Sequence, residues 1–238
     1  MMPIAERVIM ISGASRGIGL AVAKRLLNEG ARLSLGVRDT AAARDSLRTR
    51  NTTGVRFFPY SATDLKSAEN WVAGTVKTFG RLDGLVNNAG VSQPPVALTD
   101  DDETGLDEMW AVNVKGPLRL TRLALPHLAS SGTGRVVNIA SLSGKRVKNV
   151  NMGYAMTKFA LIALTHATRR EGWAQGIRAT AICPSFVRTD MTSAVDRVEP
   201  ADMIQPADLA ELVLTALTLP NNAVVAEILV NYTLEDMF

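Results

Sequence analysis

The chain has 238 residues, and its 47% hydrophobic and 21% charged content is typical of a globular protein long enough to bury one core. The net charge of +3 is too small to indicate a nucleic-acid surface. One cysteine and two histidines exclude an internal disulfide framework and leave too few ligands for a structural zinc site. No apolar run reaches the roughly 18 residues that cross a bilayer, and the N-terminus lacks a signal-peptide layout. We therefore expect a cytoplasmic protein without a metal site, a nucleic-acid partner or a membrane partner.

Short apolar runs alternate with segments of helical periodicity along the whole chain. The apolar runs predict strands at residues 8–11, 33–37, 55–60, 85–86, 135–140, 178–183 and 224–230. The periodic segments predict helices at residues 17–29, 40–50, 65–79, 102–129, 153–171 and 209–217. Gly30 is placed to end the first helix, and Asp64 or Ser67 is placed to cap the third.

Strands that alternate with helices of crossover length pair in parallel, through right-handed connections. Because the strands are continuous apolar runs, helices are expected to cover both faces of the sheet. The sequence therefore predicts an α/β fold, in which residues 1–238 form a single doubly wound Rossmann-type domain with a seven-stranded parallel sheet. Three irregular segments, residues 91–101, 142–152 and 184–206, follow strand ends, where ligands bind in such sheets.

A glycine-rich turn connects the first predicted strand to the first helix. It reads Gly13-Ala14-Ser15-Arg16-Gly17-Ile18-Gly19. Glycines let the backbone approach a pyrophosphate, and the following helix offers unpaired N–H groups and the positive end of its dipole. Glycine in such a turn can also serve packing alone, but the position between the first strand and the first helix favours a dinucleotide cofactor.

The end of the second strand indicates which dinucleotide is bound. Where NAD-binding folds usually carry an acidic residue, the chain has Val37 followed by Arg38. Arg16 extends from the glycine turn, and two guanidinium groups suit the 2′-phosphate of NADP(H). Asp39 is placed to cap the next helix, so it does not indicate NAD. We therefore predict NADP(H); the alternative is that each arginine is a solvated surface residue.

Tyr154 and Lys158 are four residues apart at the start of a predicted helix, so their side chains share one face. A positive charge beside a phenol lowers its pKa and makes it a usable general acid or base. Ser141 ends the preceding strand, where its hydroxyl can orient a carbonyl group next to the phenol. Each residue alone has an ordinary structural explanation, and the combination favours catalysis.

In this order and spacing, the motifs resemble the short-chain dehydrogenase/reductase family of the single-domain type. The matching positions are the glycine turn, Asp64, Asn87-Asn88-Ala89-Gly90, Asn113, Ser141, Tyr154, Lys158, and Pro184 followed by Val187-Arg188-Thr189. The resemblance implies an oxidoreductase that reduces a ketone or aldehyde, or oxidises the alcohol in reverse, by hydride transfer with NADP(H).

The resemblance also implies a role for each catalytic position. Tyr154 would protonate the carbonyl oxygen, and Ser141 would hydrogen-bond the same oxygen. Lys158 would hold the nicotinamide ribose and lower the pKa of the phenol. Asn113 would fix a water molecule in a proton relay behind Lys158, although an Asn within a helix has an ordinary local role as well.

Further positions would line the cofactor site by resemblance. Asp64 would accept a hydrogen bond from the adenine amino group, and Thr189 would contact the nicotinamide carboxamide. Asp64 is equally a helix N-cap. The full implied set is Gly13, Ser15, Arg16, Gly17, Ile18, Gly19, Arg38, Asp64, Leu65, Asn87, Ala89, Gly90, Tyr154, Lys158, Pro184, Val187 and Thr189.

The substrate side is predicted from position alone. The expected lining residues are Ser141, Tyr154, Gln93, Val147, Asn151, Ser185, Phe186, Met191 and Met203. Ser185 stands where the family commonly has glycine after the proline, and residues 230–233 replace the usual Asp-Gly-Gly-like ending. Both departures leave the pocket shape and the subunit contacts open.

Charged segments near these motifs have two readings. Lys145, Arg146 and Lys148 are either solvated or attract an anionic substrate, such as a carboxylate or an acyl-thioester carrier. The acidic run at residues 100–103 is expected to be a solvated helix start and not a metal site. A 3-oxoacyl-carrier reductase and a small hydroxy-acid dehydrogenase therefore remain alternatives within the family, and a non-catalytic dinucleotide sensor remains one outside it.

The resemblance implies a homodimer or homotetramer formed by the long helices that carry Asn113 and Tyr154. The apolar residues Phe159, Leu161, Ile162 and Leu164 are compatible with such an interface and equally with packing on the sheet.

Overall fold

The structure is a computed structural model that describes residues 1–48, 54–148 and 150–235. Its parallel sheet has the strand order β3-β2-β1-β4-β5-β6-β7. The strands are β1 (Val8–Ser12), β2 (Arg32–Val37), β3 (Val55–Pro59), β4 (Gly84–Asn87), β5 (Arg135–Ile139), β6 (Arg178–Pro184) and β7 (Glu227–Val230). The helices are α1 (Gly17–Asn28), α2 (Thr40–Leu47), α3 (Leu65–Phe79), α4 (Thr104–Trp110), α5 (Gly116–Ser130), α6 (Met152–Gly172) and α7 (Pro206–Thr218). This is the predicted seven-stranded, doubly wound sheet.

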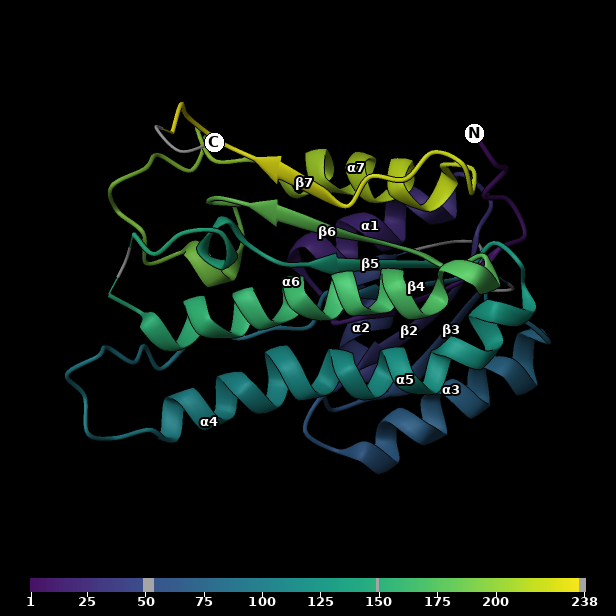
Figure 1. Ribbon diagram of the computed structural model, residues 1–238, viewed down its shortest axis with the longest axis horizontal. Coiled ribbons are helices and arrows are strands. Elements are labelled where there is room, and N and C mark those ends of the chain that lie inside the picture. Colours follow the sequence, from purple (N-terminus) through teal and green to yellow (C-terminus); the bar gives the residue numbers. More distant parts are fainter. Residues whose placement is uncertain (49–53, 149, 236–238) are drawn as a thin grey trace.

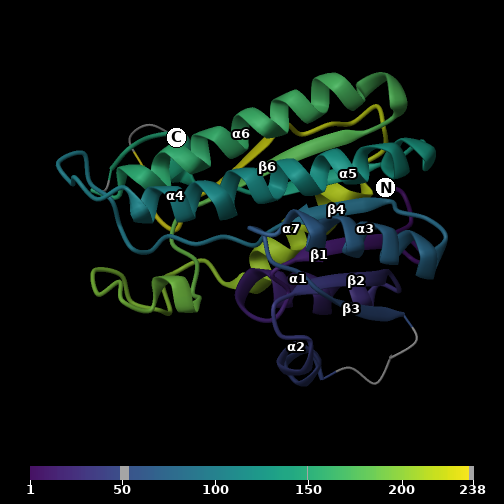
Figure 2. The same ribbon diagram turned by 90° about the horizontal axis from the view of Figure 1, so that it is seen from below.

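Helices cover both faces of the sheet, as the continuous apolar strands predict. Helices α4 and α5 run alongside α6 on one face, together with α3 (Figures 1 and 2), while α1 and α7 pack against each other on the other. Strand β1 shows the cause: Val8 and Met10 belong to the core on the α3–α5 side, and Ile9 and Ile11 to the core on the α1–α7 side. No helix in the described part of the chain is long and apolar enough to cross a membrane.

The strand order reverses direction between β1 and β4, because the chain moves outward from β1 to β3 and then returns beside β1. Parallel strands end at the same edge, so the loops after β1, β4, β5 and β6 gather at one end of the molecule (Figure 1). In open α/β sheets this crevice is where ligands bind. The glycine turn and the segment at residues 87–90 therefore face each other across it.

Several predicted elements differ in detail from the observed ones, and two helices show it most clearly. The helix expected at residues 102–129 is interrupted by a π-helical turn at Ala111–Lys115, which joins α4 to α5. The helix expected at residues 40–50 ends at Leu47, and positions 49 and 50 lie outside the described residues. The π-turn has no signal in the apolar periodicity, because it widens one turn without changing which face is buried.

The apolar residues of α6 were compatible with a subunit interface or with packing on the sheet, and their burial in the structure distinguishes the two. Leu161 and Ile162 are buried against residues of β6 and the end of β5, so they pack on the sheet. Phe159 is 45% exposed and Met156 is 44% exposed, so these two side chains face outward.

Two buried arginines hold the opposite, amino-terminal edge of the sheet. Arg135, 2% exposed, donates hydrogen bonds to the carbonyl oxygens of Leu219 (2.6 Å) and Gly134 (3.0 Å). Arg7, 8% exposed, donates to the carbonyl oxygen of Leu217 at 2.9 Å. The last carbonyls of a helix have no intrahelical partner, so these guanidinium groups satisfy the end of α7 and complement its dipole. Burial lowers the pKa of Arg135 to about 10, and it stays charged at neutral pH.

We predict that Arg135→Met destabilises the protein by about 1–3 kcal/mol, because buried carbonyl oxygens lose their donors. The measurement is urea denaturation followed by circular dichroism. Arg170→Met, at an exposed position of α6, is the matched control and should change the unfolding free energy by less than about 0.5 kcal/mol. Equal effects of the two substitutions would contradict the role of Arg135.

Candidate active site

The glycine turn after β1 requires glycine at several positions. Gly13 and Gly17 have φ of +70° and +54°, a region that L-residues with side chains rarely adopt. A Cβ atom at Gly19 would lie 2.4 Å from the carbonyl oxygen of Gly13, so any side chain there would push the turn away from α1. The turn therefore brings bare backbone to the start of the helix.

Two side chains lock this turn to the end of β4. The Ser12 hydroxyl accepts hydrogen bonds from the backbone N–H groups of Asn88 (3.0 Å) and Ala89 (3.1 Å). The Asn88 side-chain amide donates to the carbonyl oxygens of Ser12 (2.9 Å) and Gly13 (3.0 Å). These four contacts fix the two sides of the crevice relative to each other.

The start of α1 fits an anionic cofactor. Its N-cap residue is Arg16, which makes no side-chain capping bond, and the first turn contains no acidic residue. The backbone N–H groups of this first turn are therefore not capped by the Arg16 side chain, and the helix dipole adds positive potential. With the glycines that keep the approach clear, these residues fit the pyrophosphate of a nicotinamide dinucleotide.

The two arginines expected at the 2′-phosphate differ in their surroundings. Arg38 is exposed directly after β2, at the edge where an adenosine ribose would lie. Arg16 forms an ion pair with Asp190 (2.9 Å), and both side chains are 69% exposed. Asp39 caps α2 through the N–H groups of residues 41 and 42, as predicted, so it is engaged locally.

Asp64 and Asn87 also make local contacts. Asp64 is the N-cap of α3 and accepts from the N–H of Lys66 at 2.8 Å. The Asn87 side chain is buried and donates to Asn138 Oδ1 (2.8 Å) and Thr121 Oγ1 (3.1 Å). Its amide therefore faces the protein interior, and only its backbone is placed to line the cofactor crevice.

Asn113 lies in the middle of the π-helical turn and clamps the segment after β4. Its Oδ1 accepts from the N–H of Val91 (2.8 Å), and its Nδ2 donates to the carbonyl oxygen of the same residue (2.8 Å). Nδ2 also donates to Thr157 Oγ1 at 3.1 Å, and that hydroxyl donates to the carbonyl oxygen of Tyr154. The side chain thus ties the loop after β4 to the helix that carries the catalytic pair.

Tyr154 and Ser141 meet at the carboxyl edge of the sheet. Ser141 follows β5, where its Oγ accepts from the N–H of Ser143 (3.1 Å) and donates to the carbonyl oxygen of Pro184 (3.4 Å). Burial raises the pKa of the Tyr154 phenol to about 12, and its interaction with the Ser141 hydroxyl lowers it by less. The expected lowering of this pKa by Lys158 is not seen, because desolvation of the phenolate dominates.

Lys158 lies behind Tyr154 in a dry environment. Its Nζ is 5.4 Å from the centroid of the Tyr154 ring and donates to the carbonyl oxygen of Ile139 at 3.0 Å. The residue is 6% exposed, and burial lowers the pKa of its ammonium group to about 8. A Cβ at Gly90 would lie 3.8 Å from Nζ, so the ammonium lies beside the segment after β4.

Three of the residues expected to line the substrate pocket differ in their surroundings. The Asn151 side chain caps α6 through the N–H of Tyr154 (3.1 Å) and also donates to the carbonyl oxygen of Ser92 (2.8 Å). These contacts position the start of α6, and a substrate contact by Asn151 stays a prediction. Gln93 is exposed, and Val147 is 62% exposed, so neither forms an enclosed wall.

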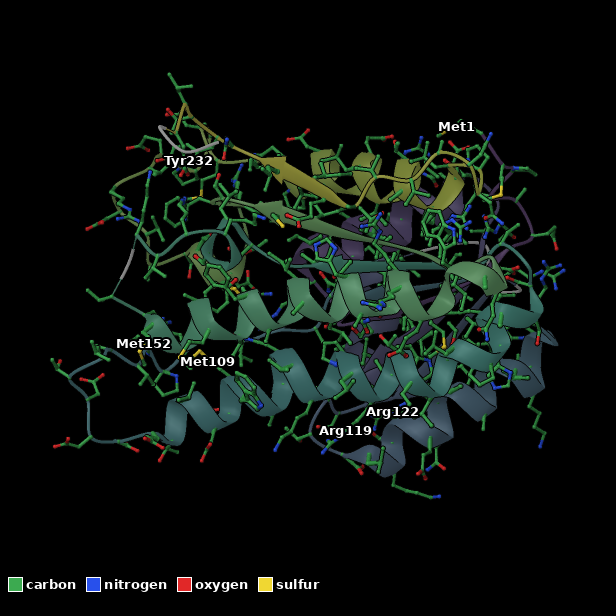
Figure 3. The ribbon with its side chains drawn as sticks, in the orientation of Figure 1. Met1, Met109, Arg119, Arg122, Met152 and Tyr232 are labelled. Atoms are coloured by element: carbon green, nitrogen blue, oxygen red, sulfur yellow. The ribbon has the colours of Figure 1, made fainter. Side chains whose placement is uncertain are left out.

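The two departures from the family pattern meet in one contact. The Ser185 hydroxyl accepts from the N–H of Tyr232 at 3.1 Å. The Tyr232 ring then packs on Phe186, with ring centroids 5.8 Å apart. Tyr232 lies at the same end of the molecule as Met109 and Met152, the end that carries the crevice (Figure 3). The serine thus fastens the C-terminal segment to the loop after β6.

The basic loop after Ser141 is neutralised within the chain. Glu235 is 9% exposed and accepts from Nε (2.6 Å) and Nη2 (2.5 Å) of Arg146 and from Lys148 (3.1 Å). Lys145 pairs with Glu227 at 2.8 Å. Each of the three basic side chains is thus paired within the chain, and attraction of an anionic substrate by this loop stays a prediction.

Several residues that position or pair with the site were not predicted from the sequence. Ser12, Asn88 and Thr157 position the site, and Asp190 and Glu235 pair with its arginine side chains. Asn88 and Thr157 lie inside the recognised motifs, so their neighbours pointed to them. The two carboxylates gave no signal, because their partners are 174 and 89 residues away. The described residues contain no cluster of three or more His, Cys, Asp or Glu side chains that could hold a metal ion.

Comparison with known proteins decides the family. A family model described as short chain dehydrogenase matches residues 7–200. The chain belongs to this family. Among solved structures, a 3-ketoacyl-(acyl-carrier-protein) reductase from Brucella melitensis complexed with NADH has a TM-score of 0.87 at 25% identity, covering 96% of this chain and 98% of that one. The structure of ElxO with NADP bound gives the same TM-score and identity, covering 95% and 98%.

Curated relatives are also oxidoreductases by name. An agropine synthesis reductase of Rhizobium rhizogenes is 44% identical over 218 residues, covering 92% of this chain and 50% of that protein. The dehydrogenase chain thus spans about half the length of the relatives it matches at this level. An uncharacterized oxidoreductase of Staphylococcus epidermidis is 32% identical over 228 residues, covering 96% and 98%.

We predict that the buried ammonium of Lys158 makes the stability of this dehydrogenase rise between about pH 8 and pH 10. The folded protein releases the Lys158 proton near pH 8, while the unfolded chain keeps it to about 10.5, so the unfolded chain binds more protons in between. Above pH 10 the raised pKa of Tyr154 acts in the opposite direction. In urea denaturation, the wild type minus Lys158→Met difference should shift by about 2–3 kcal/mol from pH 7 to pH 10. Parallel pH profiles for the two proteins would contradict it.

A second prediction concerns the Ser185 contact. Ser185→Gly restores the residue common in the family and removes the acceptor of the Tyr232 N–H, so this amide should exchange with solvent about five- to tenfold faster. Hydrogen exchange measured by NMR reports it. Amides inside β7 serve as the internal control and should keep their rates, whereas unchanged exchange at Tyr232 would show that the serine does not hold the segment.

Proposed function

We propose that the chain is an NADP(H)-dependent oxidoreductase that reduces a ketone or aldehyde by hydride transfer, with Tyr154 as the acid/base. One observation carries the proposal: Tyr154 and Ser141 interact at the carboxyl edge of the sheet, with the buried Lys158 ammonium 5.4 Å behind the phenol ring. The crevice beside them ends at an uncapped helix N-terminus that fits a dinucleotide.

The chemistry follows from these positions. The bound nicotinamide would supply or accept the hydride. A carbonyl oxygen held by the Ser141 hydroxyl would accept the proton of the Tyr154 phenol as negative charge develops on it. A neutral phenol is the required starting form for reduction, and the raised pKa keeps Tyr154 protonated at neutral pH.

The proton lost by Tyr154 must be replaced for the next turnover. Lys158 can exchange a proton near neutral pH, because burial brings its pKa to about 8. Asn113 is a positioning residue in this scheme, since both ends of its amide are engaged by Val91. It holds the loop after β4 in a fixed position relative to the helix that carries Tyr154.

The preference for NADP(H) rests on Val37 and Arg38 at the end of β2, where the adenosine ribose would lie, and on Arg16 at the start of α1. A carboxylate at this strand end would favour the ribose hydroxyl of NAD, and its replacement by Val37 removes that partner. The related structures hold NADH in one case and NADP in another, so the strand end carries the argument.

Reduction is the favoured direction because the related agropine synthesis protein and the Brucella structure are both named reductases. The Brucella structure supports the alternative of a 3-oxoacyl-carrier substrate, whereas the pairing of Arg146 and Lys148 with Glu235 weakens it. The outward-facing Phe159 and Met156 on α6 support assembly as a homodimer or homotetramer.

The test is turnover with Tyr154→Phe. We expect the NADPH-dependent rate to fall by about two to four orders of magnitude, because the carbonyl oxygen loses its proton donor. The assay follows NADPH consumption with acetoacetyl thioesters, small 2-oxo acids and free ketones and aldehydes. Met156→Leu, exposed on the same helix, is the control and should keep the wild-type rate. Full activity of the phenylalanine variant would overturn the mechanism.

A further inference from the structure

The ion pair between Arg16 and Asp190 joins the start of α1 to the segment after β6, at the proposed cofactor site. Arg16 is the N-cap residue of α1 and makes no capping bond, and Asp190 begins the short 3₁₀ helix Asp190–Thr192 in the segment after β6. The neighbouring residues also meet, since a Cβ at Gly17 would lie 3.2 Å from Thr189 Cγ2. The carboxylate of Asp190 therefore sits on a guanidinium that belongs to the proposed cofactor site.

In this ion pair another anion can replace the Asp190 carboxylate at Arg16. Both side chains are 69% exposed, and exposed pairs of this geometry contribute little because water screens the charges. A phosphate dianion offers the same guanidinium twice the charge and a bidentate geometry. The pair is thus strong enough to orient Arg16 and weak enough to yield to a phosphate.

We propose that Asp190 is a specificity-determining residue for the cofactor, acting as an internal competitor of the 2′-phosphate for Arg16. This inference rests on the proposed NADP(H) preference. Asp190 holds Arg16 toward the segment after β6 in the free protein, and the 2′-phosphate takes the guanidinium on binding. Its carboxylate also repels a nearby phosphate, so it reduces affinity for NADPH more than for NADH.

The exchange has a consequence for the substrate side. Release of Asp190 removes a tie between α1 and the segment that continues from Ser185 and Phe186. The charge on the cofactor ribose is thereby coupled to the loop beside the substrate pocket.

The experiment compares dissociation constants of NADPH and NADH by fluorescence titration. The proteins are the wild type, Asp190→Asn, Arg16→Gln and the double variant. Asp196→Asn removes the same charge from an exposed position in the same segment and is the matched control. We expect Asp190→Asn to tighten NADPH about three- to tenfold and to change NADH by less than about twofold. The control should change both by less than about twofold.

The double variant isolates the competition. In the Arg16→Gln background, Asp190→Asn should no longer improve the NADPH to NADH ratio. Equal effects of Asp190→Asn and Asp196→Asn, or a gain that persists without Arg16, would overturn the inference. The wild-type ratio separately decides the proposed cofactor: a preference for NADH would refute that proposal, while the Asp190 effect is still read from the four-protein comparison.

Discussion

The contact between Ser12 and Asn88 is the constraint on which the site depends. A parallel sheet brings strand ends to one edge, but only side chains can fix the spacing of the loops that leave it. Here one hydroxyl accepts two backbone N–H groups and one amide donates to two carbonyl oxygens, all between β1 and β4. Because these strands flank the point where the strand order reverses, the four hydrogen bonds fix the relative positions of the two loops at the expected ligand site.

Burial then gives Tyr154 and Lys158 their properties. The Lys158 ammonium and the Tyr154 phenol lie in surroundings that disfavour their charged forms, so the pKa of the lysine falls and that of the tyrosine rises. The two shifts move the pKa values of the lysine and the tyrosine apart. The phenol is then neutral, and the lysine exchanges protons near neutral pH. A cofactor that brings polar groups into this space would change both, since desolvation is the largest cause of each.

The features of the fold and the site that depend on neighbouring residues were predicted from the sequence. The seven strands, the glycine turn and the Tyr154–Lys158 pair followed from apolar runs and fixed spacings, because burial on both faces and helical periodicity are written in neighbouring residues. The π-turn around Asn113 was missed, since it changes the hydrogen-bond pattern without changing the apolar stripe. The pairing of Glu235 with Arg146 was missed because 89 residues separate them, and only the tertiary fold brings such charges together.

Two arginines near the proposed site are paired with carboxylates of the same chain, and exposure decides what each pair can do. Arg146 and Glu235 are 11% and 7% exposed at their side chains, and Arg16 and Asp190 are both 69% exposed. Removing one partner of a buried pair strands a charge away from water, so the Glu235 contact holds the C-terminal segment in place. An exposed pair loses little when water replaces its partner, so the Asp190 contact can open for a ligand. Two pairs of the same chemistry therefore serve different ends: one holds the C-terminal segment in place, and the other leaves the proposed cofactor side adjustable.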